Sequence, residues 1–147
     1  MRRSLPMLLI RVMVGVVFLT EGILKFLRPA ELGWGRFAHL GFPLPHLLAP
    51  LVGVVEVLGG AAVMLGVFAG DGALALLVVI ATAIVTTKIP ILLGHPLGRF
   101  APPLFARYGV WSFLHEARTD LCMLLGTLAV LLDSGLRLGK KTKWFER

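Results

Sequence analysis

Residues 111–132 read WSFLHEARTDLCMLLGTLAVLL, and this stretch joins a charged start to an apolar helix. Its second half is as apolar as a membrane span. Charged side chains are costly inside a bilayer, where they are usually paired and often functional. The stretch therefore predicts a membrane helix that forms one wall of a polar chamber. The polar residues on that wall are His115, Glu116, Arg118, Thr119 and Asp120.

The composition of the whole chain indicates an integral membrane protein. Of its 147 residues, 57% are hydrophobic and 16% are charged, and the mean hydropathy is +0.87. A soluble domain of this size needs more polar residues to cover its core. The lone Cys122 excludes an intrachain disulfide and a cysteine-based metal cluster.

The net charge of +7 reflects orientation in a membrane rather than nucleic-acid binding. The basic residues lie at the ends of apolar runs and in the tail, as orienting charges do. The chain has no zinc-finger spacing, P-loop or dinucleotide-binding glycine pattern. Seven Lys and Arg residues lie on the side of both termini and four in the opposite loops. This difference predicts cytoplasmic termini and a bacterial or archaeal inner membrane.

Four apolar runs are long enough to cross a bilayer as helices. Such a helix needs about 20 mainly apolar residues, and backbone groups in lipid must be satisfied within the segment. The sequence therefore predicts an all-α, integral membrane four-helix bundle formed by a single domain, residues 1–147. The first run imitates a signal peptide, but no small-x-small cleavage site follows it, so we expect it to be retained. The predicted helices are about 5–27, 46–68, 72–93 and 113–132, with a basic cytoplasmic tail at 133–147.

The connections between these helices are unequal. A tight turn is expected near Gly70, Asp71 and Gly72, which makes the second and third helices an antiparallel hairpin. The first loop, about 28–45, mixes aromatic and basic residues and predicts a short interfacial helix. The third loop, about 94–112, is too rich in proline for one regular helix.

The ionisable groups of the helices gather in one half of the membrane. Because the helices alternate in direction, seven charges from four helices fall in the half on the loop side. The other half has only Arg11, which is expected to snorkel toward the surface. Glycines beside several of these charges indicate close contact between helices, so the charged faces should point inward. The seven charges are Glu21, Lys25, Glu56, Lys88, Glu116, Arg118 and Asp120.

Two interpretations of this charged layer remain open. It is either a salt-bridged plug that fixes the helix register or a polar pocket for a small molecule. In a pocket, Lys88 and Arg118 would hold an anionic or carbonyl oxygen, while Glu56 and Asp120 would be catalytic and exchange protons. The predicted substrate-binding residues are Glu21, Lys25, Lys88, His115, Glu116 and Arg118. We expect no metal site, because the histidines are far apart in sequence.

Three segments carry a recognisable pattern: RVMVGVVFLTEGILKF at 11–26, RFAHLGFP at 36–43 and GVVEVLGGAAVMLG at 53–66. Together they resemble the DoxX family of four-helix membrane proteins, and the likeness extends over nearly the whole chain. Its most specific part is the block E-x-x-G-G. The matching positions are Arg11, Gly15, Phe18, Gly22, Lys25, Phe37, Gly41, Pro43, Gly53, Glu56, Gly59, Gly60, Gly66, Asp120 and Gly126.

The resemblance implies a membrane subunit linked to quinone reduction, sulfur-compound oxidation or oxidative-stress complexes. No sequence spacing indicates haem, flavin or an iron–sulfur cluster, and we expect no covalently bound cofactor. A quinone or a partner redox subunit, soluble or in the membrane, would then carry the electrons. The alternative is a non-enzymatic scaffold, carrier or transporter subunit. Because four helices are few for a stand-alone transporter, a homo-oligomer is expected.

Overall fold

The computed structural model describes residues 5–104 and 107–134, and its regular structure in these ranges is helical apart from an isolated bridge between Leu97 and Phe100. The predicted all-α membrane bundle is confirmed. In chain order the helices are α1 (Leu5–Leu27), α2 (Trp34–His39), α3 (Pro45–Leu65), α4 (Ala69–Ala83), the π-helix η1 (Ile84–Lys88), α5 (Ile89–Leu93) and α6 (Val110–Asp133).

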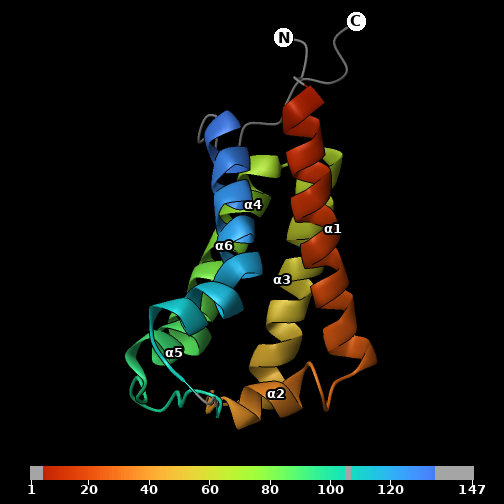
Figure 1. The fold of residues 1–147 in the computed structure, drawn as a ribbon. Coiled ribbons are helices and arrows are strands. Elements are labelled where there is room, and N and C mark those ends of the chain that lie inside the picture. Colours follow the sequence, from red (N-terminus) through yellow and green to blue (C-terminus); the bar gives the residue numbers. More distant parts are fainter. Residues whose placement is uncertain (1–4, 105–106, 135–147) are drawn as a thin grey trace, which may run out of the picture.

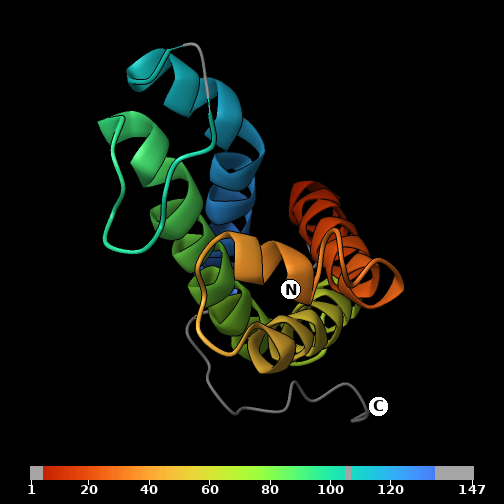
Figure 2. The ribbon, with the colours of Figure 1, turned by 90° about the horizontal axis from the view of Figure 1, so that it is seen from below.

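Long helices run between the two ends of the molecule (Figure 1). We call the end where α1 begins and α6 ends the termini end. The opposite, loop end carries α2 and the connection between α5 and α6. Seen from the loop end, α5 and the start of α6 lie apart from α1 and α3, and α2 lies across the intervening space (Figure 2).

Within the described ranges, three helical segments are long and apolar enough to cross a membrane: Leu5–Leu27, Pro45–Leu65 and Ala69–Leu93. The third of these is continuous through α4, η1 and α5. α6 has 24 residues, a length of about 36 Å at 1.5 Å per residue, so it is also long enough. It is less apolar than the other three because Glu116, Arg118 and Asp120 lie in its first half.

The turn between α3 and α4 corrects the prediction that placed it at Gly70–Gly72. The chain reverses at Gly66 and Phe68, which have the left-handed φ values of 72° and 52°. Gly70–Gly72 instead begins α4. A Cβ atom on Gly72 would lie 3.0 Å from the backbone oxygen of Gly59, so glycine is needed there for close packing against α3 rather than for a turn.

α1 and α3 touch through their backbones along the predicted glycine faces. A Cβ atom on Gly15 would lie 2.8 Å from the carbonyl oxygen of Gly60. A Cβ atom on Gly22 would lie 2.7 Å from the carbonyl oxygen of Gly53. All four glycines are buried. The two helices therefore pack as one unit, as small residues allow in membrane proteins.

Arg11 corrects a second expectation, because its side chain does not snorkel to the surface. The residue is only 6% exposed. Its guanidinium forms an ion pair with Asp133, the last residue of α6, with Nη2 and Oδ2 2.9 Å apart. Arg11 therefore joins the first and last long helices near the termini end.

Gly15→Ala should destabilise the bundle, because the added methyl group has no space between α1 and α3. Overpacking of a tight contact typically costs about 1–3 kcal/mol. The free energy of unfolding in mixed detergent micelles, followed by circular dichroism, measures the effect. Val16→Ile adds one carbon on an exposed face of α1 and should leave stability unchanged. Equal stability of the two variants would contradict the close α1–α3 contact.

Candidate functional site

A cavity of about 480 Å³ lies in the loop-end half of the bundle. Its lining side chains come from α1, α2, α3, α4, η1 and α6, and the segments that contribute them are far apart in sequence. The volume falls in the range of small-molecule binding sites, about 300–1,000 Å³. Apolar side chains dominate the wall, and charged groups interrupt it at several points. Such a wall suits a ligand that has both an apolar body and a polar group.

The cavity reaches the surface at more than one helix. Among its lining residues, Arg36 on α2 and Val78 and Thr82 on α4 are exposed, as are Glu21 on α1 and Thr119 on α6. Closer to the termini end α1 and α6 meet, since a Cβ atom on Gly126 would lie 2.8 Å from the side chain of Val14. Toward the loop end they diverge (Figure 1). Exposed lining residues on α1, α4 and α6 belong to helices of the membrane bundle, so a ligand could enter from the bilayer.

An ion pair between Lys25 and Glu56 forms one wall. The Lys25 ammonium lies 2.6 Å from a Glu56 carboxylate oxygen, and the two side chains are only 10% and 6% exposed. Glu21, one turn away on α1, has a carboxylate oxygen 4.0 Å from the same ammonium. Lys25 therefore lies between two carboxylates, one buried and one exposed.

A second ion pair forms the opposite wall. The ammonium of Lys88 lies 3.5 Å from a carboxylate oxygen of Asp120, and this pair joins the third long helical segment to α6. Its side chains are 16% and 23% exposed, so it is more accessible than the Lys25–Glu56 pair. Glu116, one turn before Asp120, also lines the cavity. The cavity thus has one lysine and at least one carboxylate on each side.

The π-helix η1 determines how the third segment presents its polar side chains. The hydroxyl groups of Thr86 and Thr87 donate hydrogen bonds to the backbone oxygens of Thr82 and Ala83, at 2.8 Å and 2.6 Å. These four residues and Lys88 all line the cavity. π-Helical turns carry one extra residue and are frequent at functional sites. Here the extra residue brings threonine, backbone and lysine groups to one wall.

α2 contributes residues to the cavity that the sequence did not indicate as a site. Arg36 and Phe37 both line it. The ring of Trp34 stacks on His46 at the start of α3, with centroids 4.4 Å apart, and this contact fixes α2 against α3. The mixture of basic and aromatic residues in this loop predicted an interfacial helix, but it did not predict that Arg36 reaches the cavity.

The structure brings six of the eight predicted site residues to the cavity: Glu21, Lys25, Glu56, Lys88, Glu116 and Asp120. Arg118 and His115 are exposed and do not line it. The Arg118 guanidinium instead donates a hydrogen bond to the backbone oxygen of His115 within the same helix. Among the described residues, no group of three or more His, Cys, Asp or Glu side chains could hold a metal ion.

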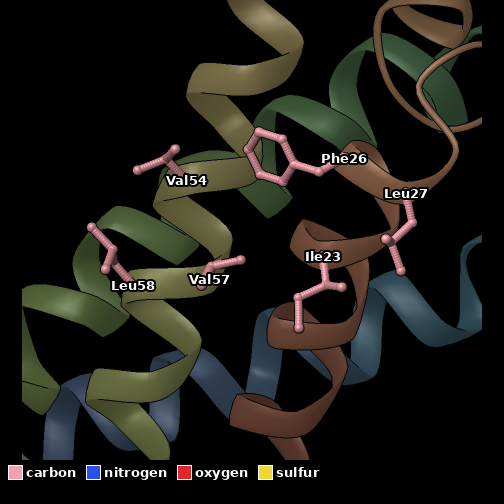
Figure 3. Close-up of a pocket in the computed structure, with 6 residues that line it drawn as sticks. All are labelled: Ile23, Phe26, Leu27, Val54, Val57 and Leu58. Carbon is pink, nitrogen blue, oxygen red and sulfur yellow. The ribbon is translucent and has the colours of Figure 1, made fainter.

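An apolar groove of about 400 Å³ lies between α1 and α3. Its walls contain no polar surface, which suits contact with hydrocarbon. The ring of Phe26 on α1 packs directly against Gly53 on α3, since a Cβ atom on Gly53 would lie 2.8 Å from it. The groove therefore has no group for chemistry. Figure 3 shows its lining residues, Ile23, Phe26, Leu27, Val54, Val57 and Leu58.

Comparison with known proteins agrees with this architecture. The DoxX family model matches residues 6–89, more than half of the chain. The chain belongs to the DoxX family. It is also 46% identical over 126 residues to the uncharacterized membrane protein Rv3486 of Mycobacterium tuberculosis, a match that covers 86% of this chain and 72% of that protein. No solved structure matches the chain.

The DoxX match ends at residue 89, directly after η1. It therefore includes the lysines on both walls of the cavity, Lys25 and Lys88, together with Glu56. Asp120 and the rest of α6 lie outside the matched range. The family-matched part thus supplies all of the cavity residues up to Lys88, and α6 supplies the rest.

Glu56→Gln should be strongly destabilising, because it leaves the buried Lys25 ammonium without its close partner. Breaking a buried pair from one side typically costs about 3–5 kcal/mol. Replacing both residues with methionine should recover most of the loss. The free energy of unfolding in detergent micelles measures these effects.

The matched control for this prediction is Glu31→Gln. It breaks the Arg28–Glu31 pair, whose side chains are 64% and 72% exposed. Surface pairs of this kind contribute about 0–1 kcal/mol. If Glu56→Gln were no more destabilising than Glu31→Gln, the Lys25–Glu56 pair would not be a structural contact.

Proposed function

We propose that the chain is a redox-associated membrane subunit whose charged cavity binds the headgroup of a quinone or a small sulfur-containing substrate. The observation that carries this proposal is the position of the two ion pairs, Lys25–Glu56 and Lys88–Asp120, on opposite walls of one cavity. Membership of the DoxX family agrees with a membrane-embedded role but specifies no ligand.

The donor set fits a molecule with oxygen atoms at opposite ends. Lysine and arginine side chains carry only hydrogen-bond donors, so Lys25, Lys88 and Arg36 suit carbonyl or oxyanion acceptors. The apolar part of the wall suits a ring or another hydrophobic body. Because lining residues on α1, α4 and α6 are exposed, such an amphipathic ligand could arrive from lipid, its isoprenoid or alkyl chain remaining in the bilayer.

The carboxylates of the cavity are suited to proton exchange. A quinone, when bound, accepts two electrons and two protons on reduction. Glu56 and Asp120 each lie beside a lysine and would supply these protons to the ligand oxygens, one from each wall. Glu21 is half exposed and near Lys25, so it would return protons from the surface. The electrons would come from a reduced partner subunit, because the cavity residues include no redox-active side chain.

A sulfur-containing substrate would use the same cations differently. An oxyanion of sulfur would accept hydrogen bonds from Lys88 and from Arg36 on α2, while Phe37 and Met123 would contact the rest of the molecule. Oxidation of such a substrate would transfer its electrons to the quinone or to the partner subunit. In both cases the cavity binds and orients, and the electron carrier lies outside this chain.

The ion pairs also support a second candidate, in which they are purely structural and the protein is a scaffold or carrier subunit. The short Lys25–Glu56 contact and the low exposure of both side chains favour this role. The two candidates differ in the role of Lys88, the cation of the more accessible pair. In the first candidate it binds ligand, and in the second it only joins two helices.

We further propose that the termini end faces the cytoplasm of a bacterial or archaeal inner membrane. The seven-to-four distribution of Lys and Arg supports this orientation. The loop end, including α2 and the connection between α5 and α6, would then face the outside. Reduction of a ligand in this half would take up protons close to the outer surface.

Lys88→Met should weaken binding of a short-chain ubiquinone analogue at least tenfold, because one of the donors to the ligand oxygens is lost. The dissociation constant is measured from the analogue's effect on thermal stability in detergent. Lys88→Arg keeps the charge and should retain most of the affinity. Glu31→Gln lies outside the cavity and should bind as the parent does.

The same titration with sulfite and thiosulfate distinguishes the two ligand classes. Stabilisation by the quinone analogue or by one sulfur oxyanion, lost in Lys88→Met and kept in Lys88→Arg, supports the cavity as a ligand site. If no ligand of either class stabilises the parent protein, or if Lys88→Met binds as tightly as the parent, the structural candidate replaces the first.

A further inference from the structure

Arg118 differs from the other Lys and Arg residues of the long helices. Within the described residues, the membrane-length segments α1, α3, α4–η1–α5 and α6 carry four such side chains. Three of them, Arg11, Lys25 and Lys88, form ion pairs with carboxylates. Arg118 on α6 is exposed and has no such partner in the described part of the chain. Because charges on membrane helices are costly and usually paired, Arg118 calls for an anion from outside the chain.

Arg118 belongs to a continuous exposed face of α6. Residues separated alternately by four and three positions lie along one side of an α-helix. From the loop end inward, the series on α6 is Trp111, His115, Arg118, Cys122 and Leu125, and each of them is exposed. We call this series the α6 stripe. Its loop-end part is aromatic and basic, whereas its deeper part is apolar.

None of the five residues of the α6 stripe is acidic. Glu116 and Asp120 are close in sequence, but each is two positions from Arg118, about 200° around the helix. Both of these carboxylates line the cavity on the opposite side of α6. The titratable side chains at the loop-end part of the stripe are therefore basic, with no carboxylate between them.

The depth of the stripe suits the boundary between lipid headgroups and hydrocarbon. Trp111 is the second residue of α6 and is 83% exposed, and tryptophan is enriched at this boundary. Arg118 follows seven residues later, about 10 Å along the helix axis. Its guanidinium donates a hydrogen bond to the backbone oxygen of His115, so the side chain bends back toward the loop end. Long basic side chains reach headgroups in this way.

The position of the stripe in the bundle makes it accessible to lipid. Seen from the loop end, the start of α6 lies at the edge of the molecule, apart from α1 and α3 (Figure 2). A second exposed cation, Arg107, precedes the helix, and its backbone oxygen accepts a hydrogen bond of 2.8 Å from the Ser112 hydroxyl in the first turn. The surface beside the stripe at the loop end is thus basic as well.

We propose that the α6 stripe binds one anionic phospholipid in the leaflet at the loop end. The phosphate accepts charge-assisted hydrogen bonds from Arg118, with His115 as a second donor. Trp111 packs against the glycerol region, and an acyl chain runs over Cys122 and Leu125 toward the middle of the membrane. The site does not depend on the proposed function, because the stripe lies on the side of α6 that faces away from Glu116 and Asp120.

The direction of the Arg118 side chain favours a lipid over a helix of another protein. A carboxylate on a partner helix would be met at the depth of the Arg118 backbone or deeper. The guanidinium instead points toward the headgroups, at the level of His115. A phospholipid has its anion and its apolar chain in the same order as the basic and apolar parts of the stripe.

Native mass spectrometry of the full chain in detergent tests this site. The protein is titrated with a phosphatidylglycerol and with a phosphatidylcholine that has the same acyl chains. The parent should bind one phosphatidylglycerol at least tenfold more tightly than phosphatidylcholine. Arg118→Gln should reduce this preference at least fivefold, because the main donor to the phosphate is lost. Arg118→Lys keeps the charge and should keep most of the preference.

Arg28→Gln is the matched control, because it removes an exposed cation at the loop end of α1, away from the stripe. It should bind phosphatidylglycerol as the parent does. Glycerol phosphate, which has the anion without acyl chains, should not displace the lipid at equal concentration. Since Arg118 is exposed, its variants should unfold at the parent's temperature in detergent without added lipid.

The proposal would be overturned if the parent showed no preference for phosphatidylglycerol, or if Arg118→Gln kept it. An equal loss in Arg28→Gln would show a general effect of charge, and displacement by glycerol phosphate would show a site for free anions. A parent dimer that became a monomer in Arg118→Gln would assign the stripe to a second copy of the chain instead. The quinone and sulfur oxyanion titrations have no bearing on these outcomes, so the lipid site and the cavity ligand can fail independently.

Discussion

The requirement that a charge inside an apolar bundle must have a partner determines the architecture of this protein. Lys25 and Glu56 can lie 2.6 Å apart only because α1 and α3 approach to backbone contact. Gly22 and Gly53 provide that approach on the same helix faces, within one turn of the charges. The ion pair and the glycine contacts therefore depend on each other, and together they set the position of the cavity wall. The second pair, Lys88–Asp120, joins α6 to the third long helical segment on the other side of the cavity.

Much of the fold follows from periodicity and depth in the sequence. α1 occupies the predicted residues 5–27, because its apolar run is uninterrupted and a bilayer requires about that length. The gathering of Lys25, Glu56, Lys88 and Asp120 at one depth follows from counting residues along helices that alternate in direction. The inward faces of α1 and α3 follow from glycines spaced three or four residues from the charges.

Partner choice could not be obtained in the same way. Depth does not reveal which lysine meets which carboxylate, since that depends on the rotation of each helix and on the order of neighbours around the bundle. Asp133 is 122 residues from Arg11 and stands at the end of an apolar run, so nothing in the local sequence connects the two. Arg118 shows the opposite error: it lies between two cavity carboxylates in sequence, but it is two positions from each, about 200° around the helix, and is exposed. The misplaced turn has a different origin: glycine occurs both in turns and in close helix contacts, and the sequence does not distinguish the two.

The π-helix at residues 84–88 has a consequence for how DoxX sequences should be compared. A π-helical turn is equivalent to one residue inserted into an α-helix, and an inserted residue rotates everything after it by about 100°. Ala69–Ala83 and the residues from Lys88 onward therefore follow different helical phases within one segment. A relative without the extra residue would carry an aligned lysine on a different face. An alignment of this chain with such a relative must consequently allow a one-residue gap in the third helix before position and orientation can be equated.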